Sequence, residues 1–154
     1  MKFVITPDIS LDKNLHRITL RLIQRAIDSL ENYDQNPNRS IHKARIAFKK
    51  IRTNLRLLRK ELGDTRYKRF NHLFRDCGQM LCHLRDDTVR AKTLQKVVDR
   101  TDGMEKLELE FNTSGVHFSE SKTVELVHNQ LEQAKHAIKP WKFKRKGFKL
   151  VKHP

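Results

Sequence analysis

One stretch, from Ile41 to Lys60, constrains this chain more than any other: IHKARIAFKKIRTNLRLLRK. It contains no acidic residue, no glycine and no proline. Its apolar residues recur in alternating steps of three and four, which places them on one face of an α-helix. These apolar positions are Ile41, Ala44, Phe48, Ile51, Leu55, Leu58 and, just beyond the stretch, Leu62. The spacing therefore predicts a long amphipathic helix with one buried face.

A second series with the same spacing begins one residue later and is basic. It comprises His42, Arg45, Lys49, Arg52, Arg56 and Arg59, and Lys43, Lys50 and Lys60 widen the positive surface. At about 1.5 Å per residue, this basic series would extend over roughly 26 Å. Like charges at these spacings destabilise a helix by a few tenths of a kcal/mol per pair. Because no glutamate offsets that cost, the pattern indicates an extended, multivalent anionic partner; the alternative is a solvated basic face.

The charge of the whole chain agrees with an anionic partner. The 154 residues suit one domain, and 33 lysines and arginines against 18 acidic residues give a formal net charge of +15. A chain this basic binds polyanions such as nucleic acid, polyphosphate, heparin-like sugars or an anionic membrane surface. No apolar run approaches the roughly 18 residues of a membrane span, and the N-terminus does not resemble a secretory signal, so we expect a cytoplasmic protein.

The scarcity of glycine and proline favours an all-α fold, which we expect to be an antiparallel bundle of about four long helices with up-down topology. The expected helices run from Ser10 or Asp12 to about Tyr33, from a Ser40 cap to Gly63, from 64 to 100, and from Ser119 or Ser121 to Lys139. Gly78 in the third helix indicates a close helix approach or a local break. Between the third and last helices we expect a loop with a helical turn, and Pro140 ends the last helix.

Two further segments carry basic residues. Lys13, Arg17, Arg21 and Arg25 form a line along the first helix, which is either part of a binding surface or an ordinary solvated face. The segment 140–154 is a basic tail that also carries Trp141, Phe143 and Phe148. Such a tail is typical of nucleic-acid or membrane binding, and equally of an element whose packing partner lies elsewhere.

Residues for catalysis or metal binding are not evident in the sequence. No glycine-rich phosphate loop or paired histidine motif occurs, and no serine or cysteine accompanies a histidine and an acid in a recognisable pattern. His83, Asp86 and Asp87 are close in sequence, but the two acids fall on different helix faces. Cys77 and Cys82 form no CxxC motif, so we expect two buried thiols in a reducing compartment. The sequence predicts binding without catalysis, with no metal and no cofactor.

Two motifs resemble those of the CHAD family, the conserved-histidine α-helical domain. The first is a histidine, an arginine three residues on, a basic pair and another arginine, here His42, Arg45, Lys49, Lys50 and Arg52. The second lies about thirty residues later and reads LCHLRDDTV over residues 81–89, with Arg85 followed by two acids. The chain departs from the family pattern at Cys82, where a glycine is usual, and in the basic pair, where two arginines are common.

The resemblance implies a helical domain whose basic surface binds inorganic polyphosphate in the cytoplasm, in association with polyphosphate granules. It assigns this binding to His42, Arg45, Lys49, Lys50, Arg52, Arg56 and Arg85, and we expect Arg17, Arg21, Arg59 and Arg75 to contribute secondarily. The chain then forms one domain over 1–154 that resembles the first half of the family, so either a second half is missing or a homodimer rebuilds the binding channel. The alternatives are a nucleic-acid-binding module, a module that docks an acidic protein, and a phosphohydrolase.

Overall fold

The computed structural model describes residues 5–6, 9–98 and 113–143, and it describes side chains for these residues outside 85–98 and 113–119. Every regular element in this part of the chain is a helix. The helices are α1 (Leu11–Glu31), α2 (Pro37–Leu57), α3 (Arg59–Leu62), α4 (Asp64–Val98) and α5 (Thr113–Ile138). The prediction of an all-α fold built on four long helices is confirmed, with α3 as one additional short turn.

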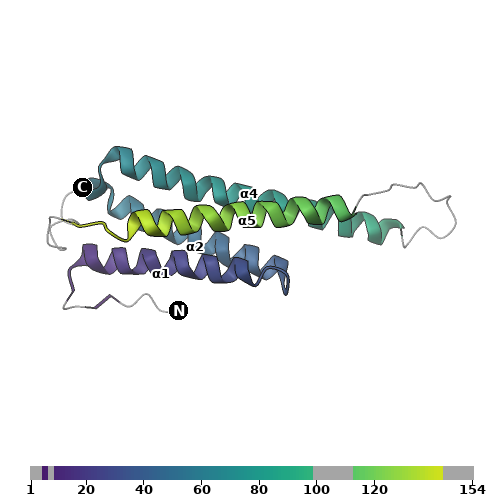
Figure 1. Ribbon diagram of the computed structural model, residues 1–154, viewed down its shortest axis with the longest axis horizontal. Helices are drawn as coiled ribbons and strands as arrows, with labels where there is room; N and C mark the ends of the chain where they lie inside the picture. Colours follow the sequence, from purple (N-terminus) through teal and green to yellow (C-terminus); the bar gives the residue numbers. More distant parts are fainter. Residues whose placement is uncertain (1–4, 7–8, 99–112, 144–154) are drawn as a thin grey trace.

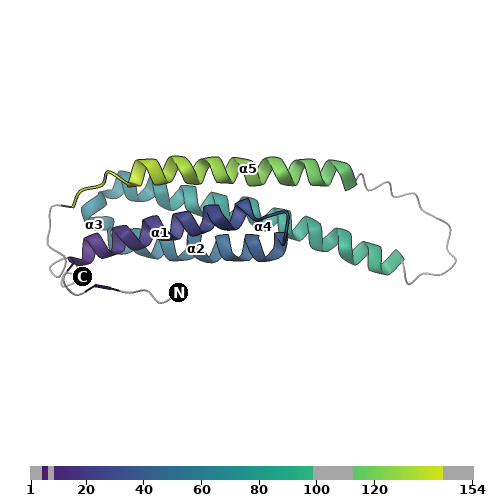
Figure 2. The same ribbon diagram turned by 60° about the horizontal axis from the view of Figure 1, so that its bottom comes forward.

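The four long helices pack side by side as an antiparallel bundle with up-down topology (Figure 1). The main contacts join α1 to α2, α2 to α4, α4 to α5 and α5 back to α1, so α2 and α5 occupy diagonal positions. In Figure 1, α5 lies in front and α2 behind it. The hairpin of α4 and α5 extends well beyond the turn between α1 and α2, as Figure 2 shows from a second direction. Because α2 packs mainly against α1 and α4, the face of α2 that is turned away from them lies outside the bundle.

The core consists of the apolar faces that the sequence spacing predicts. Ile41, Ala44, Phe48, Ile51 and Leu55 of α2 are all buried, and so are the corresponding faces of α1, α4 and α5. Burial of apolar surface at about 25 cal/mol per Å² is the main force that holds such a bundle together. The basic series of α2 thus lies beside a completed core and is not needed to build it.

The α2–α4 interface is centred on aromatic packing. The rings of Phe48 and Phe74 lie 6.0 Å apart, and both side chains are buried. Gly78 lies next to Phe48, and a Cβ atom at this position would lie 3.7 Å from Phe48 Cδ2, which is an ordinary contact distance. The α4 backbone continues through Gly78 without a break, and it also continues through 84–89, where three charges interrupt the amphipathic pattern.

Three expectations about helix ends are wrong. Asn36 caps α2, because its side-chain oxygen accepts a hydrogen bond from the Arg39 backbone N–H at 3.2 Å, and Pro37 fits the first turn. Ser40 lies inside α2, where its hydroxyl donates to the Asn32 carbonyl oxygen. The second wrong expectation is that the helix runs without a break to Gly63. It is interrupted at Leu58, so that α3 is a separate helix.

The third wrong expectation concerns α5, which begins at Thr113 instead of Ser119 or Ser121. Gly63 ends the short helix α3 and not α2; its φ of 75° is the left-handed conformation that favours glycine.

Aromatic residues close one end of the bundle. Trp141 packs edge-on against Phe70 with ring centroids 5.1 Å apart, and Phe143 packs against Trp141 and against His16 of α1. His16 Nε2 also donates a hydrogen bond to the Ile138 carbonyl oxygen at 2.9 Å. Trp141 and Phe143 therefore hold α1, α4 and the end of α5 together. Phe148, the third aromatic residue of the tail, lies outside the described residues.

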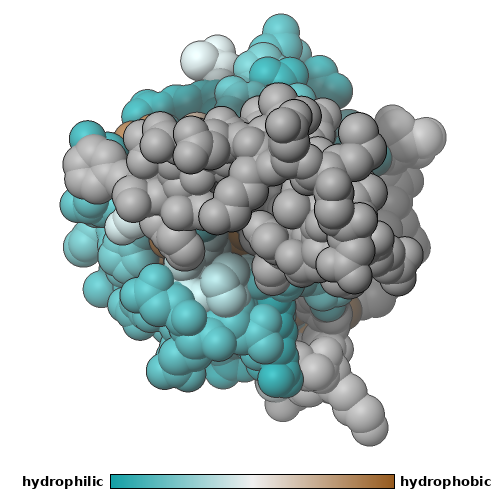
Figure 3. Space-filling view, turned by 90° about the vertical axis from the view of Figure 1, so that its right-hand side faces the viewer, coloured by the Kyte–Doolittle hydropathy of each residue, from teal (hydrophilic) through white to brown (hydrophobic). Residues whose placement is uncertain are grey.

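The described surface is largely hydrophilic. Figure 3, which views the bundle from the right-hand side of Figure 1, shows mostly hydrophilic residues with only small apolar areas among the coloured atoms. No helix in the described part of the chain is both long and apolar enough to cross a membrane.

Candidate anion-binding surface

The basic series of α2 divides into an outward face and a flank. His42, Lys49 and Arg56 are exposed on the outward face. Arg45 and Arg52 are half-buried on the flank of α2 that packs beside α4. We call these five residues the α2 stripe. Its length from His42 to Arg56 is about 21 Å at 1.5 Å per residue.

Contacts across the α2–α4 interface position this flank. Arg52 Nε donates a hydrogen bond to Asn71 Oδ1 of α4 at 3.0 Å. This bond leaves the two terminal nitrogens of the guanidinium without a described protein acceptor. Since a guanidinium has five N–H donors in a fixed plane, Arg52 is held in place by one donor and retains the others for an anion.

The α2 stripe lacks internal charge compensation. His42, Arg45, Lys49 and Arg56 form no hydrogen bond or ion pair through their side chains with any residue that the structure describes. The helix itself supplies no acid, because Pro37–Leu57 contains neither aspartate nor glutamate. Several cations therefore share one helix surface without a carboxylate, which creates a positive potential along it.

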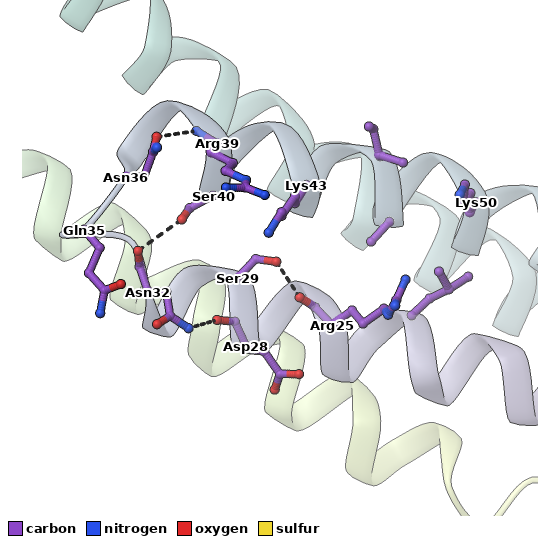
Figure 4. A pocket seen from close by; sticks show the side chains of 13 residues that line it. Arg25, Asp28, Ser29, Asn32, Gln35, Asn36, Arg39, Ser40, Lys43 and Lys50 are labelled. Carbon is purple, nitrogen blue, oxygen red and sulfur yellow. Dashed lines mark hydrogen bonds between the residues drawn. The ribbon is translucent and has the colours of Figure 1, made fainter. Parts of the chain in front are cut away.

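The adjacent lysines of the basic pair lie on different sides of α2. Lys49 is on the outward face, whereas Lys50 lines a groove between α1 and α2 together with Arg25, Arg39 and Lys43 (Figure 4). Neighbouring helix positions diverge by 100°, so one flat ligand surface does not contact both side chains. Lys50 consequently belongs to the groove and not to the α2 stripe.

The four residues expected to contribute secondarily differ in their surroundings. Arg59 donates through Nε to Asp64 Oδ1 at 2.8 Å and lies over the Tyr67 ring, and this pairing lowers the pKa of Asp64 and raises that of Arg59. Arg75 pairs with Asp76 at 2.8 Å. These two arginines carry local counter-charges that the α2 stripe lacks.

The two secondary arginines of α1 also differ from each other. Arg17 donates to Thr6 Oγ1 and to Asn14 Oδ1, both at 2.9 Å, and so fastens the segment before α1 to the helix. Arg21 is exposed. Arg85 lies in α4, but its side chain is outside the described residues, and the same holds for Asp86 and Asp87 of the candidate metal set. Among the described residues, no group of three or more histidines, cysteines or acids is arranged to hold a metal.

The two thiols have different environments. Cys77 is fully buried and donates to Gln130 Oε1 of α5 at 3.1 Å, while Cys82 is only half-buried. Burial raises the pKa of Cys77 to about 12, so this thiol remains protonated at neutral pH. The expectation of a buried thiol is confirmed for Cys77, which acts as a small apolar core residue with one polar contact, and is wrong for Cys82.

Sequence reasoning missed Arg39 and the groove that it lines. Arg39 precedes both the apolar series of α2 and the Ser40 cap that the sequence predicts for this helix. The Asn36–Pro37 pair was the available signal, because asparagine before proline is typical of a helix N-terminus. Because α2 begins at Pro37, Arg39 and Lys43 both lie in the helix, and their spacing of four residues places them on one side of it.

Comparison with known proteins agrees with this architecture. No curated protein and no solved structure matches the chain. A family model described as the CHAD domain matches residues 20–142, which span α2 and both motifs described above. Because this match covers most of the chain, the protein belongs to the CHAD domain family.

Proposed function

We propose that this protein binds inorganic polyphosphate through the α2 stripe, without catalysing a reaction. The observation that carries the proposal is the stripe itself, an acid-free helix surface of about 21 Å whose cations lack carboxylate partners among the described residues. Polyphosphate is a linear chain with regularly repeated negative charge, so it complements a linear array of cations. Membership of the CHAD family supports this ligand over other polyanions.

The residues of the stripe would make different contributions. Arg45 and Arg52, held beside α4, would donate forked hydrogen bonds to phosphate oxygens. Lys49 and Arg56 are exposed and would supply charge along the outward face. His42 would donate a hydrogen bond when protonated, and a neighbouring polyanion favours that form. In this proposal Arg85 adds a further fork from α4, and Arg59 and Arg75 contribute less because each is paired with an aspartate.

Nucleic acid is the second candidate ligand. Non-specific binding of single strands usually combines a basic groove with aromatic side chains on which bases stack. Trp141 and Phe143 are engaged at the end of the bundle, and no aromatic residue belongs to the α2 stripe. This arrangement favours a ligand without bases. An acidic protein partner is the third candidate. A competition experiment separates the first two.

The experiment is a competition titration at physiological salt. Labelled long-chain polyphosphate is bound to the protein and then challenged with single-stranded RNA, duplex DNA and heparin at equal charge concentration. We expect polyphosphate to resist each competitor by at least tenfold, which corresponds to about 1.4 kcal/mol. Equal competition by all three would refute a polyphosphate-specific site and reduce the stripe to a general basic surface.

A pair of double variants locates the site. Arg45→Gln with Arg52→Gln removes two charges from the α2 stripe. Lys139→Gln with Lys142→Gln removes two exposed charges near the end of α5, diagonally opposite α2. We expect the first variant to lose polyphosphate binding and the second to retain it, with unchanged helical circular dichroism in both. If the two variants weaken binding equally, the site is not on α2.

The proposal extends to assembly and location. We propose a cytoplasmic protein that associates with polyphosphate granules, and a homodimer in which two α2 stripes face one polyphosphate chain. Light scattering at micromolar concentration, with and without polyphosphate, tests the dimer. A protein that remains monomeric while it binds polyphosphate tightly would refute the dimer, but it would leave the role of the stripe intact.

A further inference from the structure

A groove separates the C-terminal half of α1 from the N-terminal half of α2 on the other flank of α2 from Arg45 and Arg52. Its volume is about 550 Å³, and the α1–α2 loop closes one end (Figure 4). The lining residues are Leu22, Arg25, Asp28, Ser29, Asn32, Gln35, Asn36, Arg39, Ser40, Lys43, Ile46, Ala47 and Lys50. A volume of this size is typical of sites for small ligands, which usually measure 300–1,000 Å³.

The lining of the groove is strongly positive. Arg25 of α1 faces the groove together with Arg39, Lys43 and Lys50 of α2. Asp28 is the single acidic residue of the lining, and its Oδ1 already accepts a hydrogen bond from Gln24 Nε2 at 2.8 Å. Figure 4 shows the Asp28 carboxylate directed away from α2, whereas Arg39 and Lys43 extend from α2 toward α1.

Three of these cations lack protein partners for their side chains. Within the described chain, the side chains of Arg25, Arg39 and Lys43 form no hydrogen bond or ion pair. Arg39 and Lys43 are also four residues apart on one helix, an arrangement that costs a few tenths of a kcal/mol. A concave surface lined by one sign of charge concentrates the electrostatic field and attracts counter-ions. The positive charge of the groove is therefore not balanced by acidic side chains of the described chain.

Hydrogen bonds hold the walls of the groove in place. Ser40 Oγ in α2 donates to the Asn32 carbonyl oxygen at the end of α1, at 3.2 Å. Asn36 caps α2 through the Arg39 backbone N–H, and Asn32 Nδ2 donates to the Asp28 carbonyl oxygen at 2.7 Å. The Ser40–Asn32 bond joins the two helices, and the other two bonds hold the end of α1 and the start of α2 in place. A ligand would thus bind a preformed site and would not have to order it first.

The groove also has an apolar part. Leu22 and Ala47 are buried beneath it, and Ile46 is 39% exposed at its side. An exposed isoleucine between Lys43 and Lys50 provides a contact surface for an uncharged group of a ligand, next to the cations that would hold its anionic group.

We propose that the α1–α2 groove is a second, separate anion site that binds the phosphate groups of a small ligand with two or three linked phosphates. Arg25 and Arg39 provide forked hydrogen bonds, and Lys43 and Lys50 provide point charges. The site goes beyond the proposed function, because it lies on the opposite flank of α2, is a groove between two helices, and shares no residue with the α2 stripe. It would bind inorganic triphosphate or the triphosphate of a nucleotide, and in the second case Ile46 contacts the nucleoside.

The test is isothermal titration with sodium tripolyphosphate and, separately, with ATP, at 50 mM salt. The groove variant combines Arg25→Gln with Arg39→Gln, and the control is Lys139→Gln with Lys142→Gln. We expect the groove variant to bind tripolyphosphate at least tenfold more weakly, and the control to change by less than threefold. Circular dichroism verifies folding, and Lys43→Gln alone, at an exposed position, provides a milder variant with the same expected direction.

Parallel measurements separate this site from the α2 stripe. Arg45→Gln with Arg52→Gln should lose affinity for long-chain polyphosphate and retain affinity for tripolyphosphate, and the groove variant should retain binding of the long chain. Ile46→Ala identifies the source of the phosphate. A selective loss of ATP affinity indicates a nucleotide, and an ATP affinity equal to that of the wild type indicates an inorganic anion. Wild-type protein that binds neither triphosphate at millimolar concentration, or a groove variant that binds as well as wild type, would overturn the proposal.

Discussion

The salt dependence of polyphosphate binding provides a quantitative test of the α2 stripe. Binding of a cation to a polyanion releases condensed counter-ions, so the logarithm of the affinity falls linearly with the logarithm of the salt concentration. For single-stranded nucleic acid the slope is about −0.7 per neutralised phosphate. We apply the same value to polyphosphate, which is also a flexible single chain with closely spaced charges.

The structure sets the number of contributing cations. Four members of the stripe are lysine or arginine, namely Arg45, Lys49, Arg52 and Arg56, and none of them is paired with a carboxylate among the described residues. Four neutralised phosphates give a slope of about −2.8, so affinity should fall roughly 50-fold between 50 and 200 mM salt. With Arg45 and Arg52 replaced by glutamine, the slope should be about −1.4 and the loss about 7-fold.

Fluorescence anisotropy of labelled polyphosphate at four or more salt concentrations measures these slopes. The Lys139→Gln and Lys142→Gln control should keep the wild-type slope, because its charges lie outside the α2 stripe. A stripe variant with an unchanged slope would show that these arginines do not contact phosphate. An equal reduction in the control would mean that the net charge of the chain, and not the stripe, determines the affinity.

Three further predictions concern the bundle. Gly78→Ala should raise the free energy of unfolding, measured by urea denaturation, by about 0.5–1 kcal/mol, because glycine is unfavourable inside a helix and the added Cβ meets only Phe48 at 3.7 Å. A destabilised variant would mean that α2 and α4 pack more closely. Tyr33 donates to buried Glu120 at 3.2 Å, and its pKa is raised to about 12, chiefly by burial and then by Glu120. Between pH 10 and 12 the native state therefore keeps the Tyr33 hydroxyl proton while the unfolded chain loses it, so the free energy of unfolding should fall with rising pH in that window. Tyr33→Phe should reduce this fall. A variant with the same pH profile as the wild type would contradict the assignment. Iodoacetamide at pH 8 should leave Cys77 unmodified in the native protein and modify it after denaturation, as peptide mass spectrometry would show; modification of Cys77 in the native protein would indicate that α4 and α5 separate readily.

Much of the fold follows from local sequence periodicity. The apolar steps of three and four from Ile41 to Leu62 predict the buried face of α2, and the same pattern identifies α1, α4 and α5. Such faces are readable because a helix must bury its apolar side, whichever neighbours it finds. The helix ends were less predictable. Ser40 and Asn36 are both good caps by residue type, and the structure uses Asn36, because Ser40 bonds instead to the end of α1.

The candidate site, like the fold, could be predicted from the sequence only in part. Charge spacing along α2 indicates a basic surface, and the resemblance to the CHAD family indicates its ligand. Spacing alone does not separate paired cations from unpaired ones. Arg59 continues the basic series in sequence, but the interruption at Leu58 and the contact with Asp64 give it a counter-charge. Ion pairing depends on which acid a neighbouring element brings within about 4 Å, and that is a property of packing.

The sequence by itself determined that the chain forms amphipathic helices and that one of them has a face with cations and no acids. These features depend on the 3.6-residue period and on composition, and both are local. Only the tertiary structure decided that Lys50 lines a groove with residues of α1, that Arg52 is anchored by Asn71 of α4, and that Arg25 of α1 shares that groove with Arg39. These relations join residues from different helices, so they exist only once the packing of the core has fixed where each helix lies.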